Sequence, residues 1–383
     1  MLKVQTFMKL TDLITPVALI DLPRMQHNIE RMQTQINGLG ANFRPHVKTS
    51  KCVEATRAQV QAGAQGITVS TIKEAEQFFA SGITDILYAV GMAPNKLASA
   101  AALIHKGCDL KVLTDSVQSA QAIAAFGKEH GVRFKVLIEI DTDDHRSGIK
   151  PEAAQLLEVA QALTAPECEI IGVMTHAGSS YDLNTPKALI AMAEQERAGC
   201  VRAAERLRQA GFACPVVSIG STPTALSAQN LKDVTEVRAG VYIFFDLVMH
   251  NVGVCAMNEI ALSVLTSVIG HQEDKGWAII DAGWMAMSRD RGTQKQTTDF
   301  GYGQVCDLSG APLKGYTVSA ANQEHGIISC SGQPDLEIAK HFPIGTQFRI
   351  LPNHACATGA QYPEYQALDA TGDVQTWSRF YGW

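Results

Sequence analysis

The sequence predicts an α/β protein, a (β/α)8 TIM barrel followed by a C-terminal all-β domain. Short β-rich runs alternate with helical segments from about residue 41 to residue 244, and eight such runs fit the usual size of a closed barrel. No G-x-G-x-x-G motif follows the first strand, which disfavours an open dinucleotide-binding sheet. From about residue 256 the helical periodicity nearly ceases, and this change predicts the second domain.

The elements are expected in the following order. A strand at 17–22 and a helix at 24–39 precede the barrel strands. The barrel strands themselves are predicted at 41–49, 66–71, 85–91, 109–115, 133–141, 169–178, 215–222 and 235–244. The segments between them are rich in Ala, Glu and Gln, carry apolar residues at helical spacing, and often end at Gly.

The remaining chain is typical of strands joined by turns that contain Gly, Asp and Ser. These strands are expected within 259–272, 276–283, 301–310, 315–330 and 346–356. We therefore expect residues 15–255 to form the barrel and residues 256–383 to form the β domain. The N-terminal strand, within residues 1–23, is expected to join the β domain because it precedes the barrel strands.

The composition excludes several classes of protein. A net charge of −6 and a pI near 6.0 leave no basic excess for nucleic acid. Apolar runs are too short for a membrane span, and the first residues lack a secretory signal. The nine cysteines are scattered and contain no C-x-x-C pair, which favours reduced thiols in the cytoplasm over a disulfide framework.

Polar side chains follow several of the predicted strands, where a barrel carries its active site. Lys48 ends the first barrel strand, and the segment Gly220–Thr224 resembles a strand-to-helix turn. A helix N-terminus binds anions, although Ser221 can equally serve as a plain N-cap. The neighbouring "RAGVY" segment favours phosphate. A lysine opposite a phosphate site predicts pyridoxal 5'-phosphate, whose aldehyde forms a Schiff base with an amine.

Five segments carry a family resemblance. These are "RPHVKTSK", "HAGSSYD", "SIGSTPT", "EVRAGVYIFFD" and "PNHACAT", which resemble fold-type III pyridoxal-phosphate enzymes of the D-threonine aldolase and D-serine dehydratase family. They occur in the family's order from about residue 15 to the C-terminus. The resemblance implies an alanine-racemase-like barrel with a β domain, in agreement with the architecture expected from the strand pattern.

The resemblance also implies a role for each matching residue. Lys48 is expected to hold the cofactor and move the α-proton, with Arg146 near the ring hydroxyl and the substrate carboxylate. Tyr181 is expected to face the pyridine nitrogen. His176 either packs on the ring or is a hydrogen-bonded core histidine. The phosphate ligands are expected to be Ser221, Thr222, Gly240 and Tyr242.

A possible metal site lies in the motif His354-Ala355-Cys356. Side chains two residues apart in an extended segment point the same way, so both can bind one ion, with zinc favoured and magnesium or manganese left open. By itself the motif is more often a buried cysteine beside an unrelated histidine. D-serine dehydratases resemble this sequence in having His-x-Cys here, whereas D-threonine aldolases typically have His-x-Asp. The resemblance thus favours elimination over carbon–carbon cleavage.

We therefore expect a metal-assisted dehydratase of a D-3-hydroxy amino acid. The substrate is either D-3-hydroxyaspartate, giving oxaloacetate and ammonia, or D-serine, giving pyruvate. The alternatives are an aldolase that releases glycine and an aldehyde, and a non-catalytic cofactor carrier, which would not need the β domain. Arg289 or Arg291 is a candidate for a second substrate carboxylate, unless both are solvated loop charges. His325, beside Glu324, is a further catalytic candidate, and relatives usually form homodimers.

Overall fold

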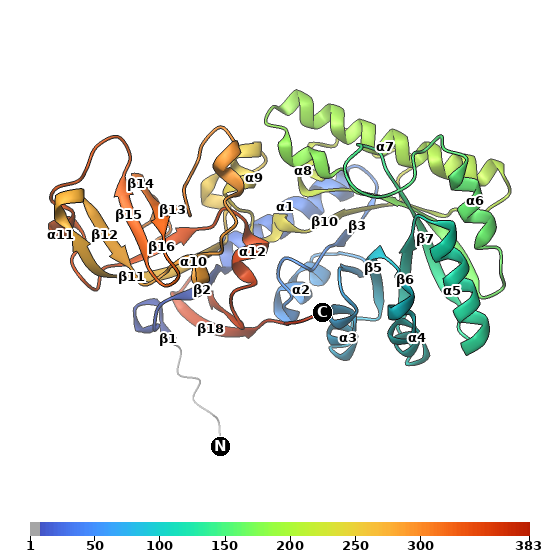
Figure 1. The fold of residues 1–383 in the computed structure, drawn as a ribbon, viewed down its shortest axis with the longest axis horizontal. Coiled ribbons are helices and arrows are strands. Elements are labelled where there is room, and N and C mark those ends of the chain that lie inside the picture. The colour runs from blue at the N-terminus through green and yellow to red at the C-terminus, as the bar shows by residue number, and fades with distance from the viewer. Residues whose placement is uncertain (1–7) are drawn as a thin grey trace, which may run out of the picture. The chain divides into compact units, whose positions relative to one another are not determined.

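A computed structural model describes residues 8–383 of the chain. The chain divides into two compact units (Figure 1). The barrel unit comprises Glu30–Gly240 with Gly382–Trp383, and the β unit comprises Val241–Tyr381 with the chain up to Ile29.

The barrel unit contains eight parallel strands. They are β3 (Asn42–Pro45), β4 (Ile67–Val69), β5 (Asp85–Gly91), β6 (Asp109–Thr114), β7 (Phe134–Ile140), β8 (Cys168–Thr175), β9 (Val216–Ile219) and β10 (Glu236–Ala239). Their order is β3-β10-β9-β8-β7-β6-β5-β4. A parallel bridge between His46 and Thr68 joins the two ends of this sheet. The fold class predicted from the alternation of strands and helices is therefore confirmed.

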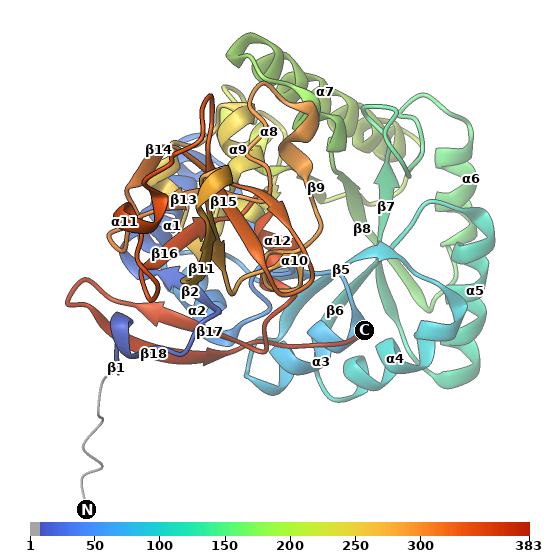
Figure 2. The same ribbon diagram turned by 60° about the vertical axis from the view of Figure 1, so that its left-hand side comes forward.

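Helices follow the strands on the outside of the sheet (Figure 2). They are α2 (Val53–Gln61), α3 (Ile72–Ala80), α4 (Leu97–His105), α5 (Val117–His130), α6 (Gln155–Ala162), α7 (Pro186–Gln209) and α8 (Thr222–Ser227), whereas α1 (Leu22–Gly38) precedes the first barrel strand. Neighbouring strands contribute Leu87, Leu113, Leu137 and Met174 to one buried apolar cluster. Burial of such residues is the main driving force for the unit's folding.

The first barrel strand is shorter than its sequence suggested. β3 ends at Pro45, and residues 47–50 form a turn closed by a hydrogen bond from the Lys51 N–H to the Val47 carbonyl (2.8 Å). Lys48 therefore lies in a turn just beyond the strand. The predicted position at the carboxyl end of the barrel is correct, but the strand assignment of Lys48 is wrong.

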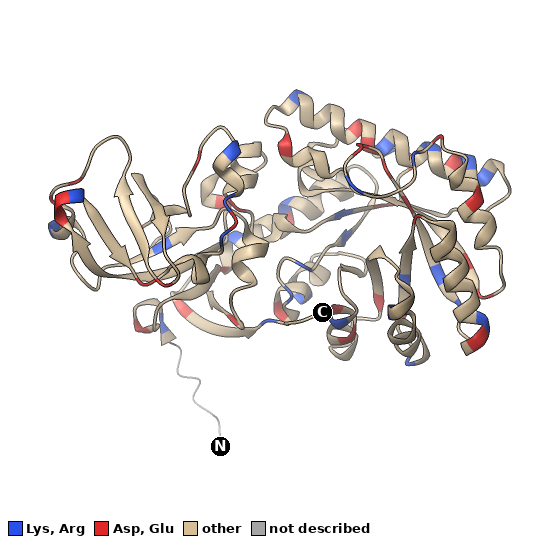
Figure 3. Cartoon of the chain, viewed as in Figure 1, with Lys and Arg blue, Asp and Glu red and all other residues tan. Residues whose placement is uncertain are grey.

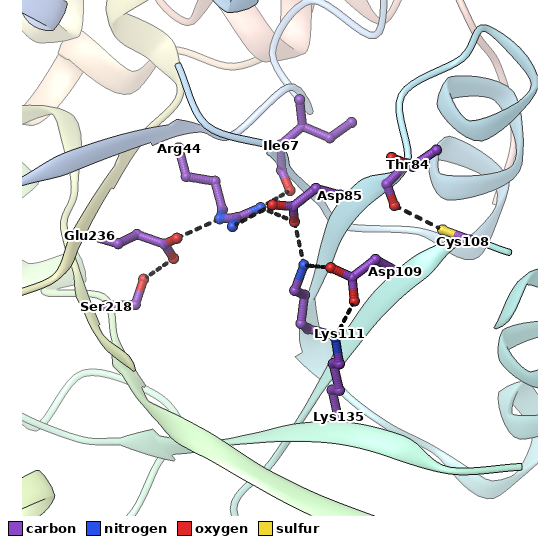
Figure 4. Close-up of polar contacts among 10 residues, drawn as sticks. All are labelled: Arg44, Ile67, Thr84, Asp85, Cys108, Asp109, Lys111, Lys135, Ser218 and Glu236. Carbon is purple, nitrogen blue, oxygen red and sulfur yellow. Dashed lines mark hydrogen bonds and ion pairs between the residues drawn. The ribbon is translucent and has the colours of Figure 1, made fainter. Parts of the chain in front are cut away.

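A chain of ion pairs connects several strands (Figure 4). Arg44 on β3 donates from Nε to Glu236 (2.6 Å) and from Nη1 to Asp85 (2.7 Å). Lys111 pairs with Asp85 and with Asp109, which also binds Lys135. Burial opposes the charge of Arg44, but Glu236 and Asp85 raise its pKa. Arg44 on β3 also donates to the carbonyl of Ile67 on β4 (3.4 Å), so it helps to hold the two ends of the sheet together.

Gly66 leaves room for this arginine, and its replacement by alanine tests the contact. At φ +66° a side chain is strained, and an added Cβ would lie 2.1 Å from Arg44 Nη1 and 2.6 Å from Asp85 Cγ. We expect Gly66→Ala to lower the free energy of unfolding by about 3 kcal/mol, because strain is added to a disrupted buried ion pair. Gly82→Ala is the control, since Gly82 has φ +95° and open space. Urea unfolding that shows equal losses for both variants would contradict this role of Arg44.

The β unit contains a ten-stranded sheet. Its strands are β1 (Met8–Lys9), β2 (Val17–Asp21), β11 (Leu262–Gln272), β12 (Trp277–Ile280), β13 (Gln304–Cys306), β14 (Pro312–Ala321), β15 (Gly326–Cys330), β16 (Gln347–Leu351), β17 (Glu364–Leu368) and β18 (Asp373–Ser378). The order is β1-β18-β17-β2-β11-β12-β15-β14-β13-β16. β2 pairs with β11 and β17, so the strand predicted at residues 17–22 lies within this sheet. Residues 1–7 of the expected N-terminal segment lie outside the described residues.

Short helices lie between the strands of the β unit. Three of them lie beyond residue 255, where only strands were expected, and the one at 247–252 lies in a segment that was expected to belong to the barrel. They are α9 (Leu247–Val252), α10 (Trp284–Met287), α11 (Ile338–His341) and α12 (Ala355–Gly359). Helices of four to six residues complete too few turns to produce a periodic pattern, which explains why sequence reasoning missed them. Among residues 8–383, no helix is both long and apolar enough to cross a membrane.

Candidate active site

Basic side chains gather around Lys48 in the barrel unit. This mouth cluster consists of His46, Lys48, Arg146, His176 and Arg238, which influence one another electrostatically. Burial, followed by the charge of Lys48, lowers the pKa of His46 well below its ordinary value. Burial also lowers the pKa of His176 to about 3, although a hydrogen bond to Gly220 opposes the shift. Both imidazoles are therefore neutral beside the lysine and the two arginines, an arrangement that suits an anionic ligand.

Arg238, a member of this cluster, is held in place by hydrogen bonds. Its Nη1 donates to Ser218 Oγ (2.5 Å), and its Nη2 donates to the Thr175 carbonyl (2.6 Å). Ser218 Oγ in turn donates to Glu236 (2.6 Å), which belongs to the ion-pair chain of Figure 4. The mouth cluster is thus anchored to the same network that connects the barrel strands. The sequence segment "RAGVY" begins with Arg238, but this residue was assigned no role of its own from the sequence.

Hydrogen bonds also join the loops that carry the predicted site residues. Asp143, after β7, accepts from the Ser179 N–H (2.9 Å) and from Ser179 Oγ (2.7 Å), after β8. Ser180 Oγ lies 2.8 Å from Ser221 Oγ, after β9. The structure therefore connects the loops of Arg146, Tyr181 and Ser221. The Tyr181 ring centroid lies 6.3 Å from that of His176.

The four residues expected to bind phosphate lie in two segments, one at the start of α8 and one directly after β10. Ser221 caps α8, with its side chain accepting from the Thr224 N–H (3.2 Å). Both Ser221 and Thr222 are buried, so the plain cap considered from the sequence is present. Gly240 follows β10, and Tyr242 is fully buried in the next short helix. Phosphate binding by Ser221, Thr222, Gly240 and Tyr242 stays a prediction.

The histidine and cysteine of the proposed metal site lie in the β unit. His354 is extended, but Cys356 lies in the first turn of α12, so the assumption of an extended pair is wrong. Their side chains nevertheless form a hydrogen bond. Burial would lower the pKa of His354, but hydrogen bonds to Asp290 (2.6 Å) and Cys356 raise it to about 11. An imidazole and a thiol this close fit a metal ion that takes the place of their shared proton.

Two carboxylates that the sequence did not single out support this motif. Asp290 contacts His354 Nδ1, and buried Asp246 accepts from the Ala355 N–H (2.9 Å) between the two candidate ligands. Among residues 8–383, no group of three His, Cys, Asp or Glu side chains is arranged to hold a metal. His354 and Cys356 therefore offer two protein donors. Nothing local in the sequence identified Asp246 or Asp290, which come together with the motif only through folding.

The remaining candidates lie elsewhere in the β unit. Arg291 pairs with Asp299 through Nη2 (2.8 and 3.1 Å), whereas the Arg289 guanidinium lies over the Trp284 ring at 5.0 Å from its centroid. His325 is exposed in the hairpin between β14 and β15. The carbonyl of Asn322, in the same hairpin, accepts a hydrogen bond from the Trp284 N–H (2.9 Å). A catalytic role for His325 stays a prediction.

Comparison with known proteins places both units in recognised families. Residues 20–248 match the model of the alanine racemase N-terminal domain, and residues 261–368 match that of a putative serine dehydratase domain. The chain is 64% identical to D-threo-3-hydroxyaspartate dehydratase of Delftia sp. (strain HT23), over 98% of this chain and 99% of that protein. It is 28% identical to D-serine dehydratase of Dictyostelium discoideum, over 95% and 96%.

Solved structures agree with these matches. The structure of D-threo-3-hydroxyaspartate dehydratase from Delftia sp. HT23 has a TM-score of 0.97 and 63% identity, covering 98% of this chain and 100% of that one. A second structure of an enzyme of that name, also with a TM-score of 0.97, is a cysteine-to-alanine variant described as the metal-free form.

Proposed function

This chain belongs to the pyridoxal-phosphate-dependent lyases that join an alanine racemase N-terminal domain to a serine dehydratase domain, and we propose that it converts D-threo-3-hydroxyaspartate to oxaloacetate and ammonia. The observation that carries the proposal is the His354–Cys356 pair within the serine dehydratase domain. Its chemistry suits the departure of a β-hydroxyl group, assisted by a metal acting as a Lewis acid.

The elimination breaks two bonds of the substrate, and the hydrolysis that follows breaks the carbon–nitrogen bond. The α-carbon loses its proton and the β-carbon loses its hydroxyl group, which together leave as water. The resulting enamine becomes an imine by moving a proton to the β-carbon. Water then adds to the imine carbon and releases ammonia, leaving oxaloacetate. No oxidant or reductant is required.

Lys48 has two tasks in this scheme. Pyridoxal phosphate, when bound, supplies an aldehyde for the Lys48 amine and a ring that withdraws electrons from the α-carbon. The Lys48 amine, when it is not bonded to the cofactor, would accept the α-proton. Arg146 and Arg238 provide positive charge for the anionic groups bound beside it. The neutral imidazole of His176 adds no competing charge.

His354 and Cys356 would hold the divalent metal, either zinc, magnesium or manganese. Asp290 contacts Nδ1 of His354, which leaves Nε2 for the ion. A carboxylate in this position orients the ring and increases its basicity as a ligand. Such a metal would make the β-hydroxyl group a better leaving group, as elimination requires.

Product analysis tests the proposal. We expect the purified protein, loaded with pyridoxal phosphate and zinc, to release equal amounts of oxaloacetate and ammonia from D-threo-3-hydroxyaspartate. D-serine is expected to give pyruvate at a lower kcat/KM, and D-threonine is expected to give no glycine. Glycine as the main product from any of these substrates would show that the protein is an aldolase and not a dehydratase. A protein that binds the cofactor but turns over none of them would be a carrier.

Arg289 is the cation that we propose for the second substrate carboxylate. Asp299 already neutralises Arg291, whereas no ion pair engages Arg289 in the described part of the chain. Arg289 also directly precedes Asp290, the partner of His354. We expect Arg289→Gln to raise KM for D-threo-3-hydroxyaspartate by about 10- to 100-fold, because a charge-assisted contact is lost. The kcat/KM for D-serine, which lacks this carboxylate, is expected to change less than about threefold.

Arg291→Gln is the matched control for this prediction. Loss of its pair with Asp299 is expected to affect both substrates equally, through stability alone. Steady-state kinetics of the two variants on the two substrates supply the comparison. Equal losses on both substrates for Arg289→Gln would exclude Arg289 as the residue that selects the carboxylate.

We also propose that the active protein is a homodimer, as is usual in this family. Light scattering during gel filtration is expected to give about twice the chain mass of 41.2 kDa. A monomer with full activity would contradict this assignment.

A further inference from the structure

One buried carboxylate connects two loops of the barrel mouth. Acidic and basic residues are interspersed along α7 (Figure 3), and Glu196 is the one among them that is buried, with 1% of its surface exposed. Its Oε1 accepts from the Ala177 N–H (2.8 Å) after β8 and from the Gly220 N–H (3.1 Å) after β9. A single oxygen atom therefore joins two successive strand-to-helix loops.

The same two loops are joined a second time on the side of His176. The ring of His176 donates from Nδ1 to the Gly220 carbonyl (3.0 Å), so both backbone polar groups of Gly220 are bound. Because His176 immediately precedes Ala177, the contacts form a closed ring through Glu196. Movement of either loop would break at least one of these hydrogen bonds.

Gly220 is suited to this position. It has φ +127°, and an added Cβ would lie 2.2 Å from the carbonyl oxygen of Arg238. The backbone of Gly220 thus packs directly against β10. This close approach fixes the position of the Gly220 N–H relative to Glu196 and of the Gly220 carbonyl relative to His176.

Burying a carboxylate is unfavourable in free energy unless hydrogen bonds compensate for the lost water. Burial raises the pKa of Glu196, while hydrogen bonds from Thr224, Ala177 and Gly220 oppose that shift. An apolar side chain would fill the same space but would leave two buried amides without an acceptor. Packing of α7 therefore does not explain a carboxylate here, whereas connection of the two loops does.

We propose that Glu196 is a positioning residue, which holds His176 and the Gly220–Thr222 loop in the geometry that receives pyridoxal phosphate. This inference rests on the proposed function for the identity of the ligand. In this role Glu196 contacts neither the ligand nor the substrate and acts through the two loop amides.

Three variants of Glu196 test the proposal. Glu196→Leu removes the acceptor, Glu196→Asp shortens the side chain so that it no longer reaches both amides, and Glu196→Gln keeps an oxygen at the same distance. We expect Glu196→Leu to weaken pyridoxal phosphate binding by about 10- to 100-fold and to accelerate hydrogen exchange in the segments 176–181 and 219–224. Glu196→Asp is expected to lie between wild type and Glu196→Leu, and Glu196→Gln to stay within about threefold of wild type.

Glu194→Leu is the matched control, because Glu194 lies on the exposed face of the same helix. It is expected to leave cofactor binding and exchange unchanged. Wild-type cofactor affinity in Glu196→Leu would overturn the proposal, as would a Gln variant no better than the Leu variant. If Glu196→Leu does not fold, unchanged affinity in Glu196→Asp would overturn it. Both measurements omit substrate, so an error in the proposed reaction would not affect their result.

Discussion

Replacing Lys48 by alanine is expected to reduce kcat by about 10⁴-fold and to remove the visible absorption band of lysine-bound pyridoxal phosphate. Both effects come from the loss of one amine, which is the covalent attachment point and the base that takes the α-proton. Absorption spectra after reconstitution, and steady-state kinetics with D-threo-3-hydroxyaspartate, measure them separately.

The surroundings of Lys48 explain why no other amine should substitute for it. Burial and the charge of Lys48 keep His46 neutral, and the mouth cluster otherwise offers guanidinium groups, which do not form Schiff bases. Lys51, only three residues away, pairs with the buried carboxylate of Glu74 (3.0 Å). The amine of Lys51 is therefore engaged in an ion pair.

Lys51→Gln is the matched control for this prediction. It removes a neighbouring lysine of the same segment and is expected to retain the absorption band and most of the activity. A Lys48→Ala protein that keeps the lysine-bound band, or a Lys51→Gln protein that loses it, would show that the attachment point was assigned wrongly. Added methylamine is expected to restore part of the α-proton transfer in Lys48→Ala, since a small amine can occupy the vacated space.

The barrel was predictable because its signals are local. Each strand is a short β-rich run, and each following helix shows its own periodicity, so the alternation was visible without tertiary information. The ends of the strands were less certain. β3 stops at Pro45, and after the bridge from His46 to Thr68 the chain turns over residues 47–50, where the Lys51 N–H donates to the Val47 carbonyl. Lys48 was therefore placed at the correct end of the barrel but in the wrong kind of element.

Residues that act through tertiary contacts were not predictable. Glu196 lies within a long helix, and the charged residues next to it in the sequence are Glu194, which is exposed, and Arg197, which is partly buried. Asp290 is separated from His354 by 63 intervening residues of the β unit, counted from 291 to 353. Motif reasoning finds side chains that bind ligands directly, whereas the carboxylates that support them become visible only when the chain is folded.

Metal removal is expected to have the second large effect. Treatment with EDTA, or replacement of His354 or Cys356 by alanine, is expected to lower kcat/KM by about 10³-fold, since Lewis-acid assistance contributes several kcal/mol to loss of the β-hydroxyl group. Zinc should restore the EDTA-treated protein but neither alanine variant. Asp290→Asn is expected to weaken metal binding by about 10- to 100-fold while the bound form stays active, because it alters only the partner of His354.

The visible absorption band of lysine-bound pyridoxal phosphate distinguishes loss of the metal from loss of Lys48. It is expected to persist in all the metal-site variants, because the two groups supply different parts of the reaction. Cys330→Ala is the matched control, since Cys330 is a partly exposed thiol of the same unit without a histidine two residues before it. Metal content measured by atomic emission should follow activity across the series. Full activity in metal-free protein would mean that the β-hydroxyl group leaves by proton transfer from a side chain, for which exposed His325 would then be the first candidate.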